Sequence, residues 1–156
     1  MSDGTTDQVV TPVPGRVIAL TEVPDPVFSA ALVGPGTAVD PPRNGPVQAV
    51  APVSGEVVKL HPHAFVVKTP GGAGVLTHLG IDTVQLAGEG FELHVAEGDE
   101  VAAGDPVVTW NPAEVEAGGR SPVVPVVALD ATPEALSGVR APGPIAVGDV
   151  LFAWVH

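Results

Sequence analysis

The chain of 156 residues contains no cysteine and no tyrosine, and its lysines and arginines together number only six. Without cysteine, disulfides, thiolate metal ligands and cysteine nucleophiles are excluded. The 18 acidic residues give a net charge of −12. This charge argues against nucleic-acid binding, which depends on Lys and Arg neutralising phosphates. It favours a basic protein partner instead, through electrostatic steering.

Long apolar runs are also missing. No stretch reaches the roughly 18 apolar residues of a membrane span, and no basic-then-apolar leader opens the chain. We therefore expect a cytoplasmic protein with no membrane insertion. The 19 glycines and 18 prolines interrupt the chain too often for long helices. The many short valine-rich runs that remain predict an all-β fold, a sandwich or a barrel.

Internal repetition refines this fold class. Two pairs of segments repeat at similar spacing: residues 11–20 with 51–60, and residues 101–110 with 145–154. One repeat alone could not bury its apolar face, so the repeats predict two interleaved copies in one closed antiparallel β-structure.

The rest of the chain fits one domain with little helix. We expect a single domain over residues 11–156, preceded by a flexible polar tail at residues 1–10. Helix is expected only in short pieces. One is Asn111–Ala117, which begins with an asparagine N-cap followed by proline, and the other is Thr132–Leu136.

Three of the five histidines fall in two short segments, 61–65 and 76–84, on either side of a turn sequence. The strand-forming runs that flank Thr69-Pro70-Gly71-Gly72 predict a β-hairpin. A turn centred on Pro70-Gly71 places His63 directly opposite His78, with their Cβ atoms roughly 4.5–5.5 Å apart. Two imidazoles at that distance can share one phosphoryl group or one metal ion. His94 and His156 are interpreted as packed or surface residues.

Two other functions are compatible with parts of the sequence. His61-x-His63 and His78-x-x-x-Asp82 have the spacing of metal ligands, which fits a zinc-dependent endopeptidase of β-architecture. That class of enzyme carries the two elements in the opposite order. The segment 97–107 suggests a biotinyl or lipoyl carrier, but neither Lys59 nor Lys68 has the context of a modified lysine.

Five motifs in order resemble one family. They are Pro52–Val57, His63–Phe65, Thr77–Val84, Gly88–Phe91 and Gly98–Val101. Over about residues 10–155 they are similar to the glucose-type IIA component of the bacterial phosphoenolpyruvate-dependent sugar phosphotransferase system. The resemblance implies an antiparallel β-sandwich of the duplicated hybrid motif type, acting as a monomeric phosphocarrier.

The resemblance also implies roles for the histidines. His78 accepts a phosphoryl group from the carrier protein HPr and passes it to a cysteine of a IIB domain, and His63 supports that group. Neutral His78 is expected to attack through Nε2 while its other ring nitrogen donates to a backbone carbonyl. His61 stands where the family commonly has a threonine, which makes it a candidate supporting residue.

A partner surface and a shared metal complete these expectations. The family surrounds its histidines with apolar residues and an acidic rim that receives arginines of HPr and IIB. By motif, these positions are Asp25, Val27, Phe28, Val33, Leu76, Asp82 and Val84. No cofactor is obligatory, although His63 and His78 can share a zinc ion with a partner protein. Some relatives also bind regulatory target proteins.

Overall fold

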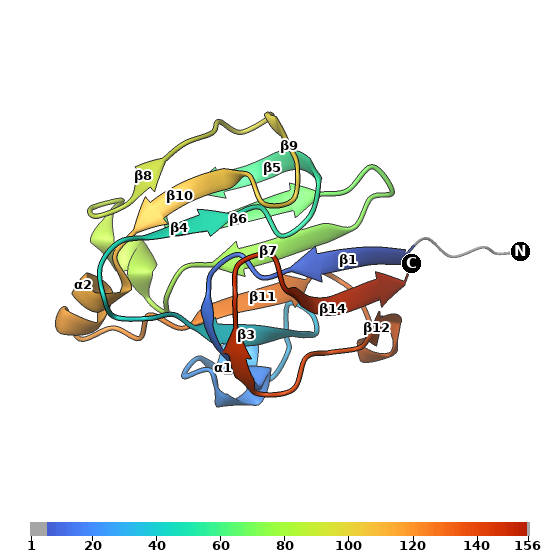
Figure 1. Ribbon diagram of the computed structural model, residues 1–156, viewed down its shortest axis with the longest axis horizontal. Coiled ribbons are helices and arrows are strands. Elements are labelled where there is room, and N and C mark those ends of the chain that lie inside the picture. Colours follow the sequence, from blue (N-terminus) through green and yellow to red (C-terminus); the bar gives the residue numbers. More distant parts are fainter. Residues whose placement is uncertain (1–5, 156) are drawn as a thin grey trace, which may run out of the picture.

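The computed structural model describes residues 6–155, and strands dominate this part of the chain (Figure 1). The strands are β1 (Thr6–Val10), β2 (Gly15–Ile18), β3 (Gly36–Asp40), β4 (Val47–Val50), β5 (Gly55–His61), β6 (Ala64–Lys68), β7 (Gly74–His78), β8 (Glu92–Leu93), β9 (Glu100–Val101), β10 (Pro106–Trp110), β11 (Val124–Ala128), β12 (Leu136–Ser137), β13 (Gly143–Ile145) and β14 (Val150–Val155). The helical pieces are η1 (Leu20–Glu22), α1 (Pro26–Ser29), η2 (Thr83–Leu86), α2 (Pro112–Ala117) and η3 (Pro133–Ala135).

All strand pairs are antiparallel, so the predicted all-β antiparallel class is confirmed. The large sheet has eight strands in the order β13-β2-β3-β11-β7-β6-β5-β9. Two three-stranded sheets, β1-β14-β12 and β4-β10-β8, complete the fold. Across residues 6–155, every helix is too short or too polar to cross a bilayer.

The internal repeat is visible as a reciprocal pair of hydrogen bonds. Val10 N–H donates to Pro52 O over 2.9 Å, and Val50 N–H donates to Pro12 O over 2.9 Å. Val10 corresponds to Val50 in the repeat, and Pro12 corresponds to Pro52. The residue type that donates in one copy therefore also donates in the other. Because each copy supplies one donor and one acceptor to the other, the two copies are interleaved, as the sequence predicted.

The expectation of a flexible tail over residues 1–10 is wrong for residues 6–10. Thr6–Val10 forms β1, which pairs along its length with β14 at the other end of the chain (Figure 1). Val9 is fully buried. The polar composition of the segment hid this strand, because its partner lies at the far end of the sequence and the pairing satisfies the backbone groups. Residues 1–5 lie outside the described part.

Both expected helical pieces are present. Asn111 caps α2, and its side-chain oxygen accepts a hydrogen bond from Ala113 N–H over 3.1 Å. The second piece is the 3₁₀ turn η3, in which Thr132 makes no side-chain capping bond. The segment after Asp25 forms the one-turn helix α1, with the Asp25 side chain accepting a hydrogen bond from Val27 N–H over 2.8 Å.

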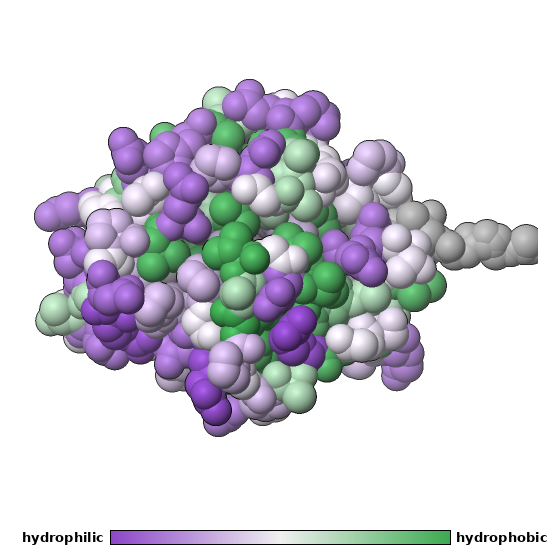
Figure 2. Space-filling view, viewed as in Figure 1, coloured by the Kyte–Doolittle hydropathy of each residue, from purple (hydrophilic) through white to green (hydrophobic). Residues whose placement is uncertain are grey.

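The buried apolar residues form two clusters. The larger one lies between the sheets and contains Trp110, Phe65 and Phe152. The smaller one lies beneath α1 and consists of Leu20, Val23, Phe28, Ala38, Ile81, Val123 and Val127. Figure 2 shows apolar atoms gathered near the middle of one face and hydrophilic atoms around its margin. The smaller cluster is the one that supports the functional site described below.

Two glycines at equivalent positions of the repeat, Gly15 and Gly55, allow a close approach of backbones. A Cβ on Gly55 would lie 2.1 Å from Lys68 O, which is shorter than any allowed distance between non-bonded atoms. We expect Gly55→Ala to lower the free energy of unfolding by about 3 kcal/mol. The measurement is urea denaturation, with Gly74→Ala as the control because its Cβ would make only ordinary contacts, 3.5 Å at the nearest. Equal stability losses in the two variants would contradict this steric account.

Candidate functional site

The hairpin β6–β7 carries the site, but its register differs by one residue from the prediction. Ala64 lies opposite His78, and Phe65 lies opposite Thr77. The turn holds the expected Pro70-Gly71 centre, closed by Gly72 N–H donating to Thr69 O over 2.9 Å. Gly72 then adds an extra residue at φ +97°, and Thr69 pairs with Ala73. This three-residue loop with a glycine bulge shifts the ladder by one position.

The two histidines nevertheless meet, because His63 lies outside the strand. It occupies the two-residue turn between β5 and β6, next to Pro62, and its carbonyl accepts from Leu79 N–H over 2.7 Å. The alternation of faces along a strand does not apply to a turn residue. The ring centroids of His63 and His78 lie 5.2 Å apart at an interplanar angle of 68°. The predicted pairing is therefore present with a different backbone origin.

One hydrogen bond fixes the His78 ring. Its Nδ1 lies 2.5 Å from Gly80 O. A carbonyl oxygen can only accept, so Nδ1 carries the proton in the neutral ring and Nε2 presents a lone pair. This contact is the expected one between the second ring nitrogen and a backbone carbonyl.

The loop that supplies this carbonyl is held on both sides. Gly80 has φ +82°, and a Cβ there would lie 2.7 Å from the Thr83 methyl carbon and 3.1 Å from Ser121 O. Ile81 N–H donates to Ser121 O over 2.8 Å. Thr83 Oγ1 donates to Leu79 O over 2.8 Å. Sequence reasoning gave Thr83 no role, although a threonine hydroxyl commonly donates to the carbonyl four residues before it, here that of Leu79.

Burial makes both imidazoles less basic. Desolvation lowers the pKa of His78, and the Gly80 carbonyl and the carboxylates of Asp25 and Asp82 oppose that shift in part. Desolvation also lowers the pKa of His63, and the neighbouring charges of His78 and His61 lower it further. Both rings are therefore predominantly neutral at pH 7, the state in which an imidazole nitrogen can act as a nucleophile.

The other expected site residues surround His78 unevenly. Val27 and Val84 are exposed, at 42% and 61%. Val33 and Leu76 are half-buried and pack against the smaller core cluster. Phe28 is only 7% exposed, and its ring centroid lies 5.2 Å from that of His78.

The expectation that Phe28 presents a surface to a partner is therefore wrong. Its ring packs into the smaller core cluster and supports His78 from the side. The sequence could not distinguish these roles, because an aromatic residue after Asp25-Pro26 fits both an exposed patch and a helix that buries one face.

His61 joins the two functional histidines through stacking. It ends β5, is exposed, and its ring lies nearly parallel to that of His63, with centroids 5.7 Å apart and an interplanar angle of 21°. His94 lies apart from this group and contacts Thr109 Oγ1 through Nε2 at 2.6 Å. His156 lies outside the described residues.

The geometry does not support the zinc endopeptidase alternative. Between residues 6 and 155, no three His, Asp or Glu side chains converge in a way that could hold a metal ion. His63 and His78 offer two imidazole ligands, one fewer than the three protein ligands of catalytic zinc sites. A zinc ion at this pair would need further ligands from another molecule.

Comparison with known proteins agrees with this geometry. Residues 7–133 match the model of the phosphoenolpyruvate-dependent sugar phosphotransferase system, EIIA 1 family. The chain belongs to this family. As an EIIA component it is a phosphotransferase protein, a phosphocarrier of the sugar phosphotransferase system.

Individual EIIA relatives show how far the similarity extends. The glucose-specific EIIA component of Halalkalibacterium halodurans is 46% identical over 121 residues, covering 76% of this chain and 68% of the relative. The structure of glucose permease IIA from Mycoplasma capricolum matches 96% of both chains with 36% identity and a TM-score of 0.87.

Some relatives carry the EIIA segment within a longer chain. The β-glucoside-specific EIIBCA component of Bacillus subtilis is 35% identical over 153 residues, and this chain spans 25% of its length. Such relatives join EIIA to an EIIB segment, which supports a IIB domain as a partner of this EIIA chain.

The lowered pKa values make stability depend on pH. An unfolded chain with ordinary histidines, of pKa about 6.5, takes up protons before the folded chain does. The stabilisation by neutral His63 and His78 is therefore complete above about pH 6.5 and is lost as the pH falls through their folded pKa values.

We expect the free energy of unfolding to fall between about pH 8 and about pH 5.5, and to fall less in the variant His63→Gln/His78→Gln. Urea denaturation at both pH values measures this difference. An equal fall in the variant and the parent chain would contradict the assignment of the pH dependence to these two residues.

Proposed function

We propose that His78 is the phosphoryl acceptor of this EIIA chain, taking the group from phospho-HPr and delivering it to a cysteine of a IIB domain. The observation that carries this proposal is the contact of His78 Nδ1 with Gly80 O, which leaves Nε2 free to attack. The family assignment indicates phosphoryl transfer as the reaction. The hydrogen bond supports Nε2 of His78 as the atom that attacks phosphorus.

The chemistry needs no proton transfer at His78. The Nε2 lone pair forms a bond to phosphorus while the bond between phosphorus and the donor histidine nitrogen breaks. Nδ1 keeps its proton, which remains hydrogen-bonded to Gly80 O. In the second step a cysteine thiolate forms a bond to the same phosphorus while the bond between phosphorus and Nε2 breaks, and the electron pair of that bond returns to Nε2. Catalysis of this kind rests on positioning and on donors around the phosphoryl oxygens.

His63 is the donor that the geometry offers. Its ring centroid lies 5.2 Å from that of His78 at an interplanar angle of 68°, so a ring N–H of His63 can donate to the oxygens of a phosphoryl group on His78. The ring of His61 stacks on that of His63, with centroids 5.7 Å apart. We assign His61 a supporting role in this site, in place of the threonine common in the family.

The exposed part of the site forms the partner surface. Val27 and Val84 supply apolar contacts, and Asp25 and Asp82 supply negative charge next to the histidines. A small surface of this type suits a carrier that must release each partner quickly. Its negative charge fits arginines on HPr and on a IIB domain. Because those partners act in the cytoplasm, we place this chain there as well.

Phosphate incorporation separates the two histidines. After incubation with phosphoenolpyruvate, enzyme I and HPr, intact-mass measurement should show one acid-labile phosphate on the parent chain and none on His78→Gln. The His63→Gln variant should accept the phosphate but pass it to a IIB domain about a hundredfold more slowly, because it lacks the imidazole donor. A His78→Gln chain that still gains the phosphate would overturn the acceptor assignment.

Removing the charge of Asp82 should slow the encounter with IIB. Asp82 has φ +60°, which asparagine tolerates, so Asp82→Asn changes charge without changing the backbone. We expect a several-fold slower transfer at low salt and a smaller difference at high salt. Asp130→Asn is the matched control, because Asp130 is also exposed and has φ +59°. Equal rates for both variants in rapid-quench transfer assays would exclude a docking role for Asp82.

A further inference from the structure

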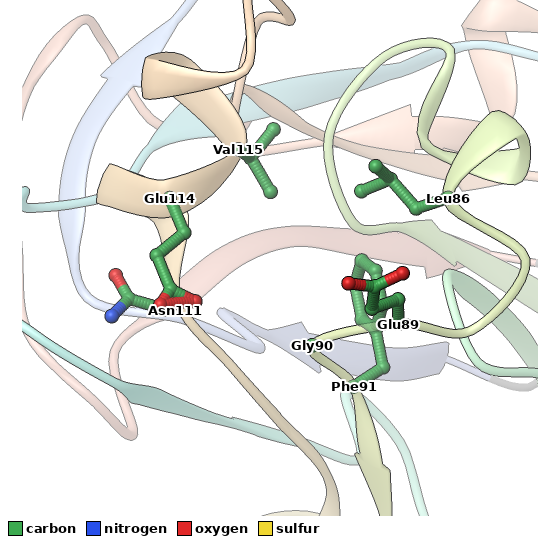
Figure 3. A pocket seen from close by; sticks show the side chains of 7 residues that line it. All are labelled: Leu86, Glu89, Gly90, Phe91, Asn111, Glu114 and Val115. Carbon is green, nitrogen blue, oxygen red and sulfur yellow. The ribbon is translucent and has the colours of Figure 1, made fainter.

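A groove between α2 and the loop that follows η2 has no part in the roles proposed above. It has a volume of about 230 Å³ and is lined by Leu86, Glu89, Gly90, Phe91, Asn111, Glu114 and Val115. Figure 3 shows one wall formed by α2 and the residue before it, and the other formed by the loop that follows η2. We call this hollow the acidic groove. Its volume is below the range of about 300–1,000 Å³ for pockets that hold drug-sized ligands, so it suits a single side chain.

The floor of the acidic groove is apolar and rigid. Leu86 and Val115 face each other across it in Figure 3, and Val115 is buried. Phe91 stacks on Trp110, a fully buried residue, with ring centroids 6.1 Å apart and an interplanar angle of 7°. An aromatic face held in this way can accept a flat cation, and the aliphatic side chains can pack along a hydrocarbon stem.

The rim of the acidic groove is negative and unpaired. Within residues 6–155, the carboxylates of Glu89 and Glu114 have neither a hydrogen bond nor an ion pair. The adjoining hollow adds Glu92. No basic side chain is among the lining residues, and Arg120 at the end of α2 donates instead to Gln85 Oε1 over 3.1 Å. Two free carboxylates above an apolar floor fit an amphipathic cation.

We propose that the acidic groove binds an arginine side chain of a partner protein. The guanidinium group presents five N–H donors in one plane, so it can bridge Glu89 and Glu114 while its face lies on Phe91. A lysine ammonium has no such plane and would satisfy the groove less well. The Asn111 side-chain oxygen already accepts the capping bond from Ala113 N–H over 3.1 Å.

The place of the groove links it to the histidine site. A Cβ on Gly88, in the groove loop, would lie 3.2 Å from Pro62 Cγ, beside His63. A Cβ on Gly80 would lie 3.5 Å from Val115 Cγ1. A partner bound over His63 and His78 can therefore place an arginine in the groove at the same time. This last step rests on the proposed function, whereas the chemistry of the groove does not.

The test uses the whole chain and Nα-acetyl-arginine N-methylamide as the probe, followed by NMR of the Leu86 and Val115 methyl groups. We expect saturable shifts of both methyl signals, weakened by added salt. The neutral analogue Nα-acetyl-citrulline N-methylamide should bind at least about tenfold more weakly, because it lacks the charge that pairs with the carboxylates. Equal shifts with both probes, or none with the arginine probe, would overturn the proposal.

Variants locate the effect. Glu89→Gln/Glu114→Gln should weaken arginine binding by about tenfold or more, and the matched pair Glu22→Gln/Glu134→Gln, which removes the same charge elsewhere, should not. An equal loss of affinity for the arginine probe in both double variants would show that net charge alone causes the effect, and it would contradict the proposal. His78→Gln should bind the probe as the parent chain does, so a failed groove and a failed acceptor assignment give different results.

Discussion

The hydrogen bond between His78 Nδ1 and Gly80 O is the constraint on which the site depends. It selects the tautomer, fixes the ring plane and leaves the lone pair of Nε2 free. The bond requires a carbonyl that points back at the strand, which a left-handed residue at Gly80 supplies. Ser121 and Thr83 then hold the loop on either side of that residue. A short polar network thus holds the ring of a strand-end histidine in one orientation and one tautomer, as the proposed acceptor role requires.

The scaffold beneath this bond is symmetric, whereas the site is not. The two repeats exchange equivalent bonds at Pro12 and Pro52, and each repeat begins a strand with a glycine against a carbonyl. Only the second repeat is followed by the hairpin that carries His63 and His78. In the first repeat the chain continues into η1 and α1, and Phe28 of α1 packs beside His78. One copy therefore supplies the paired histidines, and the other supplies an aromatic side chain that packs beside them.

Much of this could be predicted from local sequence. The hairpin, the asparagine cap of α2 and the antiparallel class follow from turn residues, a capping pattern and valine-rich runs. The register of the β6–β7 hairpin could not be predicted, because a glycine bulge at Gly72 adds a residue that the turn sequence alone does not reveal. The β1 strand was missed because its partner is the last strand of the chain. The acidic groove was not predicted, since its two walls come from separate segments, residues 86–91 and 111–115, that only the fold brings together.

The pairing of the first and last strands has a mechanical consequence. β1 and β14 run antiparallel side by side, so the two ends of the described chain emerge from the same ladder (Figure 1). A pull transmitted through either end acts first on that ladder and on the β12 strand beyond it. The hairpin β6–β7 lies in a different sheet and outside this path. A tether at either end would thus load the β1-β14-β12 sheet before the sheet that holds His78.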